Sequence, residues 1–159
     1  IQDGTIVHVN AGRQCTTIGD DVTVGHAAII HACTLHDRAF VGIGHPIRLD
    51  QFNEPQPDFA LLAPRPDDYT RGTPSPAEVL LLIEISDTSL RFDRNVKLPL
   101  YGTHGIREFW IIDLAGQAVE VCRGPRAGGY GSVTRLDATA ELEPEALPGL
   151  RLRVSDILP

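Results

Sequence analysis

The C-terminal part of the chain alternates apolar runs with turn-forming residues, a pattern that predicts a sheet with helical connections. Four runs rich in leucine, isoleucine, valine and aromatic residues have the length and composition of buried strands. They are FALLAP (59–64), EVLLLIEIS (78–86), EFWIIDL (108–114) and AVEVCR (118–123). Because helical and strand patterns alternate here, we expect both element types in one fold.

A helix, a hairpin and a last strand complete this pattern. Residues 91–102 predict a helix, which Pro99 should kink or restart because proline lacks the amide hydrogen and crowds the carbonyl four residues back. Gly128 and Gly129 predict a hairpin. The alternating LRLRV of residues 150–154 predicts a final strand with its apolar side chains on one face.

The first 44 residues have a different texture. They hold four of the six histidines and none of the twelve prolines. Aliphatic residues recur every six positions, with one slip of a single residue, which is typical of hexapeptide repeats that coil into a β-helix. The repeating positions are Ile18, Val24, Ile30, Leu35 and Val41. We therefore expect two domains, residues 1–44 and residues 45–159.

Composition narrows the class of protein. The 159 residues are 42% hydrophobic and 22% charged, as in ordinary globular proteins. No apolar run approaches the roughly 20 residues of a membrane span and no leader pattern opens the sequence, so we expect a cytoplasmic protein without membrane contact. Cys15, Cys33 and Cys122 are widely spaced and odd in number, which favours free thiols. The net charge of −7 disfavours a protein that coats nucleic acid but allows a local basic cleft.

Three charged residues of the C-terminal part are candidates for chemistry. Asp58 precedes the first predicted strand, Glu84 interrupts the apolar run LLIEIS, and Lys97 lies in the predicted helix. Carboxylates at the start of one strand and near the end of its neighbour can converge on Mg²⁺, which needs few protein ligands. A glutamate inside an apolar strand is costly to bury unless it is paired or binds a metal. Two structural interpretations stay open: Asp58 caps a turn, and Glu84 pairs with Lys97 or an arginine.

This part of the chain resembles the Uma-type restriction endonuclease family of the PD-(D/E)XK nuclease superfamily. The resemblance covers residues 45–159 and rests on NEPQPDFALLAPRPDDY, on VLLLIEISDTSLRFDRNVKLPLYGTHGIREFWIIDL, on AVEVCRGPRAGGY and on LPGLRLRVSDIL. It implies an α+β fold with a restriction-endonuclease-like mixed sheet and helices. It also implies hydrolysis of a phosphodiester bond, with DNA as the partner.

The same resemblance implies roles for individual residues. Asp58 and Glu84 would hold Mg²⁺ or Mn²⁺, which orients and deprotonates the attacking water. Ser86 stands where the superfamily motif has a lysine, and Lys97 would supply the positive charge from a displaced position. Tyr101 and Trp110 would belong to the core.

In the N-terminal part, TVGHAAIIHAC (23–33) places His26 and His31 five residues apart. In a helix this spacing separates the rings by roughly 140°, and in a flat strand it puts them on opposite faces, so neither element would aim both at one metal. A coil of short strands has corners, which relax this strict alternation.

Residues 1–44 resemble the middle of a γ-class carbonic anhydrase, through IQDGTIVHV, TTIGDDVTVGHAAIIHACTL and FVGIG. That family forms a left-handed β-helix trimer. The resemblance implies Zn²⁺ held across a subunit interface by His8 and His31 of one chain and His26 of its neighbour, with an open position for the water that hydrates CO₂. Two rings five residues apart would then serve two different ions. His36 matches no ligand.

Each resemblance covers only part of its family's fold, so the chain looks like a fusion of two fragments. We weigh three hypotheses of different kinds. One is a metal-dependent nuclease, which the N-terminal element would assemble into a homotrimer. Another is a zinc-binding trimer with an inert C-terminal domain, and the third is an interaction protein without catalysis. The first is favoured because the segment that supports it is the longer one.

Overall fold

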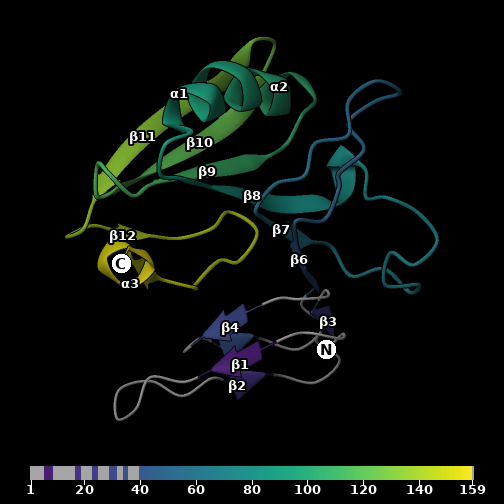
Figure 1. Cartoon of the computed structure of the whole chain (residues 1–159), viewed down its shortest axis with the longest axis horizontal. Coiled ribbons are helices and arrows are strands. Elements are labelled where there is room, and N and C mark those ends of the chain that lie inside the picture. Colours follow the sequence, from purple (N-terminus) through teal and green to yellow (C-terminus); the bar gives the residue numbers. More distant parts are fainter. Residues whose placement is uncertain are drawn as a thin grey trace.

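The computed structural model describes residues 41–158 with their side chains and, before them, the backbone of short strands only. These strands are β1 (Ile6–His8), β2 (Thr17–Ile18), β3 (Thr23–Val24), β4 (Ile29–His31), β5 (Thr34–Leu35) and the first residue of β6 (Phe40–Ile43). Parallel pairing joins β1 to β4 (Figure 1) and also joins β2 to β5. The predicted left-handed β-helix falls mostly outside the described residues and stays a prediction.

A seven-stranded mixed sheet forms the centre of the structure, in the order β11-β10-β9-β8-β7-β6-β3. Its long strands are β7 (Phe59–Leu62), β8 (Val79–Ser86), β9 (Glu108–Asp113), β10 (Ala118–Arg126) and β11 (Gly129–Asp137). Strands β8 and β9 are parallel, whereas β6, β7 and β8 pair antiparallel, as do β9, β10 and β11. All four strands predicted from apolar runs are confirmed, as is the hairpin between β10 and β11.

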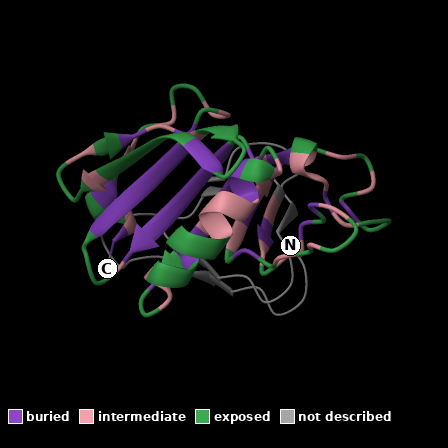
Figure 2. Cartoon of the chain, turned by 90° about the horizontal axis from the view of Figure 1, so that it is seen from above, coloured by how far each residue is buried: buried purple, intermediate pink, exposed green. Residues whose placement is uncertain are grey.

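A helical segment connects the parallel strands β8 and β9 and covers one face of the sheet (Figures 1 and 2). It consists of α1 (Leu90–Phe92), the π-helical turn η2 (Asp93–Lys97) and α2 (Leu98–Thr103). The Leu98 amide donates to the Asp93 carbonyl five residues back, which defines the wide turn. The predicted helix is confirmed, and the restart expected at Pro99 occurs at this change of hydrogen bonding. A short 3₁₀ turn, η1 (Pro76–Glu78), precedes β8.

The sheet is buried on both faces, as parallel central strands require. On the helix side, Tyr101 and Ile106 pack against Leu82 and Phe109. On the other side, Trp110 and its apolar neighbours pack against the C-terminal elements β12 (Glu141–Leu142), β13 (Leu152–Arg153) and α3 (Val154–Ile157). Most residues of β8 and β9 therefore face one of two cores, and the face decides which polar groups they can contact.

Of the final strand expected over residues 150–154, only Leu152–Arg153 forms, and the rest of the prediction is wrong. Strand β13 is two residues long because its partner β12 is equally short, so no ladder continues past Arg153. Val154 begins α3 instead and is fully buried, with Leu158 also buried one turn later. Burial at positions i and i+4 is what a helix achieves and an edge strand does not.

The structure also bears on two expectations that were drawn from composition. Cys122 is a buried free thiol, while Cys15 and Cys33 lie outside the described residues. Within the described part of the chain, no helix combines the length and the apolar character needed to span a membrane.

Candidate functional site

Asp58 and Glu84 lie side by side where β7 begins and β8 approaches its end. The antiparallel register pairs Phe59 with Ile83, so the residue before β7 stands beside the residue after Ile83. The Asp58 amide donates to Glu84 Oε2 at 3.3 Å, and the Ile85 amide donates to Asp58 Oδ2 at 2.7 Å. The structure thus brings together the two carboxylates singled out in the sequence. Their role as metal ligands stays a prediction.

Glu84 is buried under the helical segment, with 1% of its surface exposed. Alternation along β8 turns it to the same face as Ser86, toward the helices. Its Oε1 accepts a hydrogen bond from the Tyr101 hydroxyl at 2.9 Å, and Lys97 Nζ lies 2.8 Å from its Oε2. Burial raises the pKa of Glu84, and Lys97 and Tyr101 only partly offset this. The interpretation in which Glu84 pairs with Lys97 is therefore confirmed for this state of the site.

Lys97 is the only lysine in the chain. Its ammonium lies between two buried carboxylates, 2.8 Å from Glu84 Oε2 and 3.2 Å from Asp93 Oδ1, and 22% of the side chain is exposed. Burial disfavours the ammonium, but the hydrogen bond and charge of Glu84, together with the charge of Asp93, raise the pKa of Lys97 overall. The residue is thus held charged beside Glu84, and its catalytic role stays a prediction.

Asp93 and Tyr101 also contact the buried charges of this site, although no polar role was expected for either from the sequence. Tyr101 is fully buried, as expected of a core residue, yet its hydroxyl donates to Glu84. Asp93 accepts hydrogen bonds on Oδ2 from the hydroxyls of Ser86 and Ser89, both at 2.6 Å. The spacing of four from Asp93 to Lys97 to Tyr101 places polar groups on one helix face and could have revealed both.

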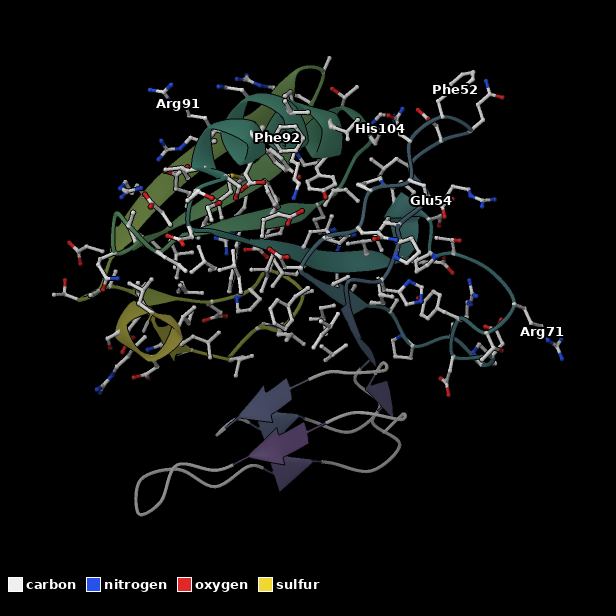
Figure 3. All side chains as sticks on the ribbon, viewed as in Figure 1. Phe52, Glu54, Arg71, Arg91, Phe92 and His104 are labelled. Carbon is white, nitrogen blue, oxygen red and sulfur yellow. The ribbon has the colours of Figure 1, made fainter. Side chains whose placement is uncertain are left out.

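The segment before Asp58 is tied to the end of α2. Asp50 accepts hydrogen bonds from Asn53 and from the Phe52 amide, and His104 Nε2 lies 2.8 Å from its carboxylate. Figure 3 shows Phe52 on this projecting loop and His104 beside it. The hydrogen bond to the Leu100 carbonyl, together with Asp50, raises the pKa of His104. The contact links the loop that carries Asp58 to the helix that carries Lys97.

Three other buried carboxylates, those of Glu108, Asp113 and Glu120, have arginine partners instead of a lysine. Glu108 is paired with Arg123 at 2.7 Å, and Arg135 bridges Asp113 at 2.8 Å and Glu120 at 2.9 Å. Arginine offers several donors in a fixed plane and suits permanent pairing of this kind. These carboxylates are therefore structural, whereas Glu84 has an exposed carboxylate and a lysine as neighbours.

The acidic pair suits a hard divalent cation. Mg²⁺ is commonly held through one or two carboxylates and completes its shell with water and substrate phosphate. Asp58 is exposed and adjoins the buried Glu84, so the pair borders solvent on the Asp58 side. Among residues 41–158 no cluster of three or more histidine, cysteine, aspartate or glutamate side chains has metal-binding geometry. The donor set thus fits Mg²⁺ or Mn²⁺ held by two carboxylates.

The N-terminal histidines are only partly described. His8 of β1 and His31 of β4 are direct partners in the parallel register, so the backbone puts these two predicted zinc ligands at adjacent positions. His26 lies outside the described residues.

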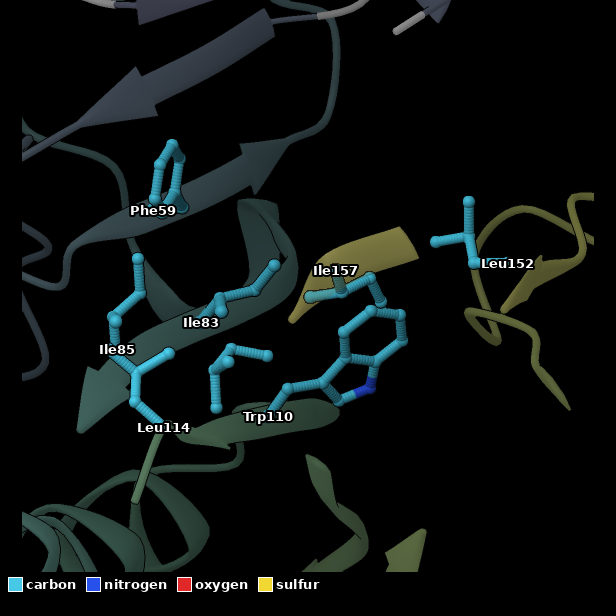
Figure 4. A pocket seen from close by; sticks show the side chains of 8 residues that line it. Phe59, Ile83, Ile85, Trp110, Leu114, Leu152 and Ile157 are labelled. Atoms are coloured by element: carbon cyan, nitrogen blue, oxygen red, sulfur yellow. The ribbon is translucent and has the colours of Figure 1, made fainter. Parts of the chain in front are cut away.

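An apolar pocket of about 330 Å³ lies on the opposite face of the sheet (Figure 4). Ile83 and Ile85 line it from β8, where they flank Glu84 and point the other way, and Phe59 and Trp110 contribute from the neighbouring strands. Its lining carries no carboxylate. The pocket is therefore separate from the acidic site.

A solved structure shares the fold. It is described as the crystal structure of "a putative nuclease belonging to DUF820" from Anabaena variabilis. The match covers 76% of this chain and 68% of that protein's chain, with a TM-score of 0.52 and 19% sequence identity. At this identity the likeness concerns the fold alone, a mixed sheet crossed by a helix. The fold class is thus α+β, with a mixed sheet and a helix as in that structure. A family model, Uma2, described as "Putative restriction endonuclease", matches residues 3–155, and the chain belongs to this family.

Curated relatives match a shorter part of the sequence. Gamma carbonic anhydrase 2 of Arabidopsis thaliana is 57% identical over 49 residues, which is 28% of this chain and 18% of that protein. Protein YrdA of Escherichia coli is 46% identical over 50 residues, 28% of this chain and 27% of its own. A "Probable carbonic anhydrase" of Methanocaldococcus jannaschii is 45% identical over 47 residues, 30% of this chain and 29% of its own. The chain thus spans less than a third of the length of these relatives.

Proposed function

We propose that this protein is a metal-dependent nuclease that hydrolyses phosphodiester bonds in DNA. Asp58 and Glu84 hold Mg²⁺ or Mn²⁺, and Lys97 provides the positive charge of the site. The observation that carries the proposal is Glu84, which is buried inside an apolar strand beside an exposed carboxylate and the chain's only lysine. A glutamate with a purely structural role would be expected to have an arginine partner, as Glu108 and Glu120 have.

The position of each residue suggests a separate role for it in hydrolysis. The bound cation would supply an activated water and neutralise charge on the phosphate. Lys97 stabilises negative charge that develops on the phosphate, since a fixed cation in a partly dry site acts strongly on charge formed nearby. Tyr101 holds Glu84 Oε1, and Asp58 marks the open side from which substrate and cation approach.

Nicking of supercoiled plasmid tests this proposal. With Mg²⁺ or Mn²⁺ the wild-type protein should nick the plasmid, and Glu84→Gln should abolish nicking while the protein stays folded, because the amide keeps the shape but removes the charge that a cation requires. Glu108→Gln is the matched control, since it changes another buried strand glutamate, whose partners Arg123 and Trp110 lie outside the site, and should leave nicking intact. Wild-type nicking by Glu84→Gln would overturn the assignment.

A second function is favoured by the N-terminal register. Because His8 and His31 are adjacent partners of β1 and β4, and this region matches the gamma carbonic anhydrases, a zinc site completed by His26 of a neighbouring chain is a candidate. Neutral imidazoles with one open position suit a zinc ion that activates water.

Metal content and assembly test this second candidate together. If the ion joins chains, zinc and the trimer should rise and fall together, because the metal's binding free energy is shared with assembly. A chelator should dissociate the trimer in sedimentation, and His26→Ala and His31→Ala should each lose zinc, whereas the control His36→Ala should keep it. A zinc-free monomer, or a trimer indifferent to chelator, would exclude the site.

A further inference from the structure

The carboxylate of Asp93 is held rigidly under the helical segment. It is 1% exposed, and two serine hydroxyls, one from the end of β8 and one from the residue before α1, donate to the same oxygen Oδ2 at 2.6 Å. A buried carboxylate is costly unless it is paired and hydrogen-bonded. Two short contacts from two different elements thus fix both its place and its orientation.

The other oxygen, Oδ1, is left to Lys97. It accepts no hydrogen bond among residues 41–158, and the Lys97 ammonium lies 3.2 Å away. No arginine of the described residues forms an ion pair with Asp93. The lysine side chain has a flexible four-carbon stem, so its position depends on such partners.

We propose that Asp93 is a positioning residue that keeps Lys97 at the active site when a metal ion takes up the charge of Glu84. This inference rests on the proposed nuclease function. In the structure Lys97 contacts both carboxylates, and Glu84 is the nearer one. Once Glu84 ligates a cation it attracts the ammonium less, and cation and ammonium repel each other. Asp93 is as buried as Glu84 and would then hold the ammonium beside the phosphate instead of releasing it to solvent.

A double-mutant cycle on the nicking reaction tests the link between the two residues. Asp93→Asn keeps the shape and should lower kcat about 10- to 100-fold, with KM and the Mg²⁺ concentration for half activity unchanged, because only the placement of Lys97 changes. In a Lys97→Ala background the same change should have no further effect. Asp113→Asn, which changes a buried aspartate at the end of β9, is the control and should leave kcat unchanged. Additive losses in the cycle would overturn the proposal.

A measurement without catalysis separates this proposal from the nuclease function. Because the chain has one lysine, its ¹⁵N-labelled ammonium gives a single side-chain signal. Exchange of these protons with water should be about tenfold faster in Asp93→Asn than in the wild type and unchanged in Asp113→Asn. Ser89→Ala, which removes one of the two hydroxyls, should give a smaller increase and serves if Asp93→Asn does not fold. Unchanged exchange in a folded Asp93→Asn protein would refute the positioning role, whereas absent nicking by the wild type would refute only the nuclease.

Discussion

Tyr101→Phe isolates one hydrogen bond of the acidic site. The substitution removes a hydroxyl that donates to Glu84 Oε1 at 2.9 Å and leaves the buried ring, which packs edge-on against Phe109, in place. The chain contains a matched control in Tyr130, whose ring also contacts Phe109 and whose buried hydroxyl has no partner among the described residues. The two variants therefore differ in whether the lost hydroxyl served a carboxylate.

The expected magnitude follows from the partner of the hydroxyl. A hydrogen bond to a charged group contributes about 1.5–3 kcal/mol, and a buried carboxylate that loses a donor is left undersolvated. Tyr101→Phe should thus lower the free energy of unfolding by about 2 kcal/mol. Tyr130→Phe should cost nothing or stabilise slightly, since it removes a buried hydroxyl that makes no bond.

Urea unfolding measures both changes, because the midpoint shifts with stability while the slope stays constant. The cost of Tyr101→Phe should shrink toward 1 kcal/mol or less in a Glu84→Gln background, where the acceptor is neutral. Equal midpoints for Tyr101→Phe and Tyr130→Phe would refute the reasoning. A full cost that persists in the Glu84→Gln background would show that the hydroxyl acts elsewhere.

Lys97→Ala should reduce nicking by roughly 10²–10³-fold, the usual effect of removing one electrostatic donor from an active site. An unchanged rate in the plasmid assay would show that Lys97 has only a structural role. The contact between His104 and Asp50 should stabilise the protein below pH 6.5 and lose this effect as the pH rises through the raised pKa of His104. Urea midpoints of the wild type and His104→Gln should thus differ most at about pH 6 and converge at alkaline pH. A difference independent of pH would contradict the charged contact.

Local sequence determined the elements of the C-terminal part and much of its candidate chemistry. Apolar runs between turn residues are enough to predict buried strands. A run of about four to eight apolar residues is too short for most helices but matches the length of a strand that is buried in a sheet. A lone glutamate in such a run had to be paired or bound, and Glu84 is paired with Lys97. The helix between β8 and β9 was likewise predicted from the residue pattern of this segment.

The tertiary structure alone decided which polar groups share the site. Asp58 meets Glu84 because of the register between β7 and β8, and Tyr101 donates to Glu84 because the helix crosses the sheet at that point. The spacing of Asp93 and Lys97 is visible in the sequence, but the serine partners of Asp93 are not, since they come from the end of a strand and from the turn before a helix. Residues 150–154 show the converse, in that their alternation fits a strand but no neighbouring strand is long enough to pair with it. Contacts of this kind depend on register and crossing geometry, which pair residues distant in the chain, and local patterns carry no record of that pairing.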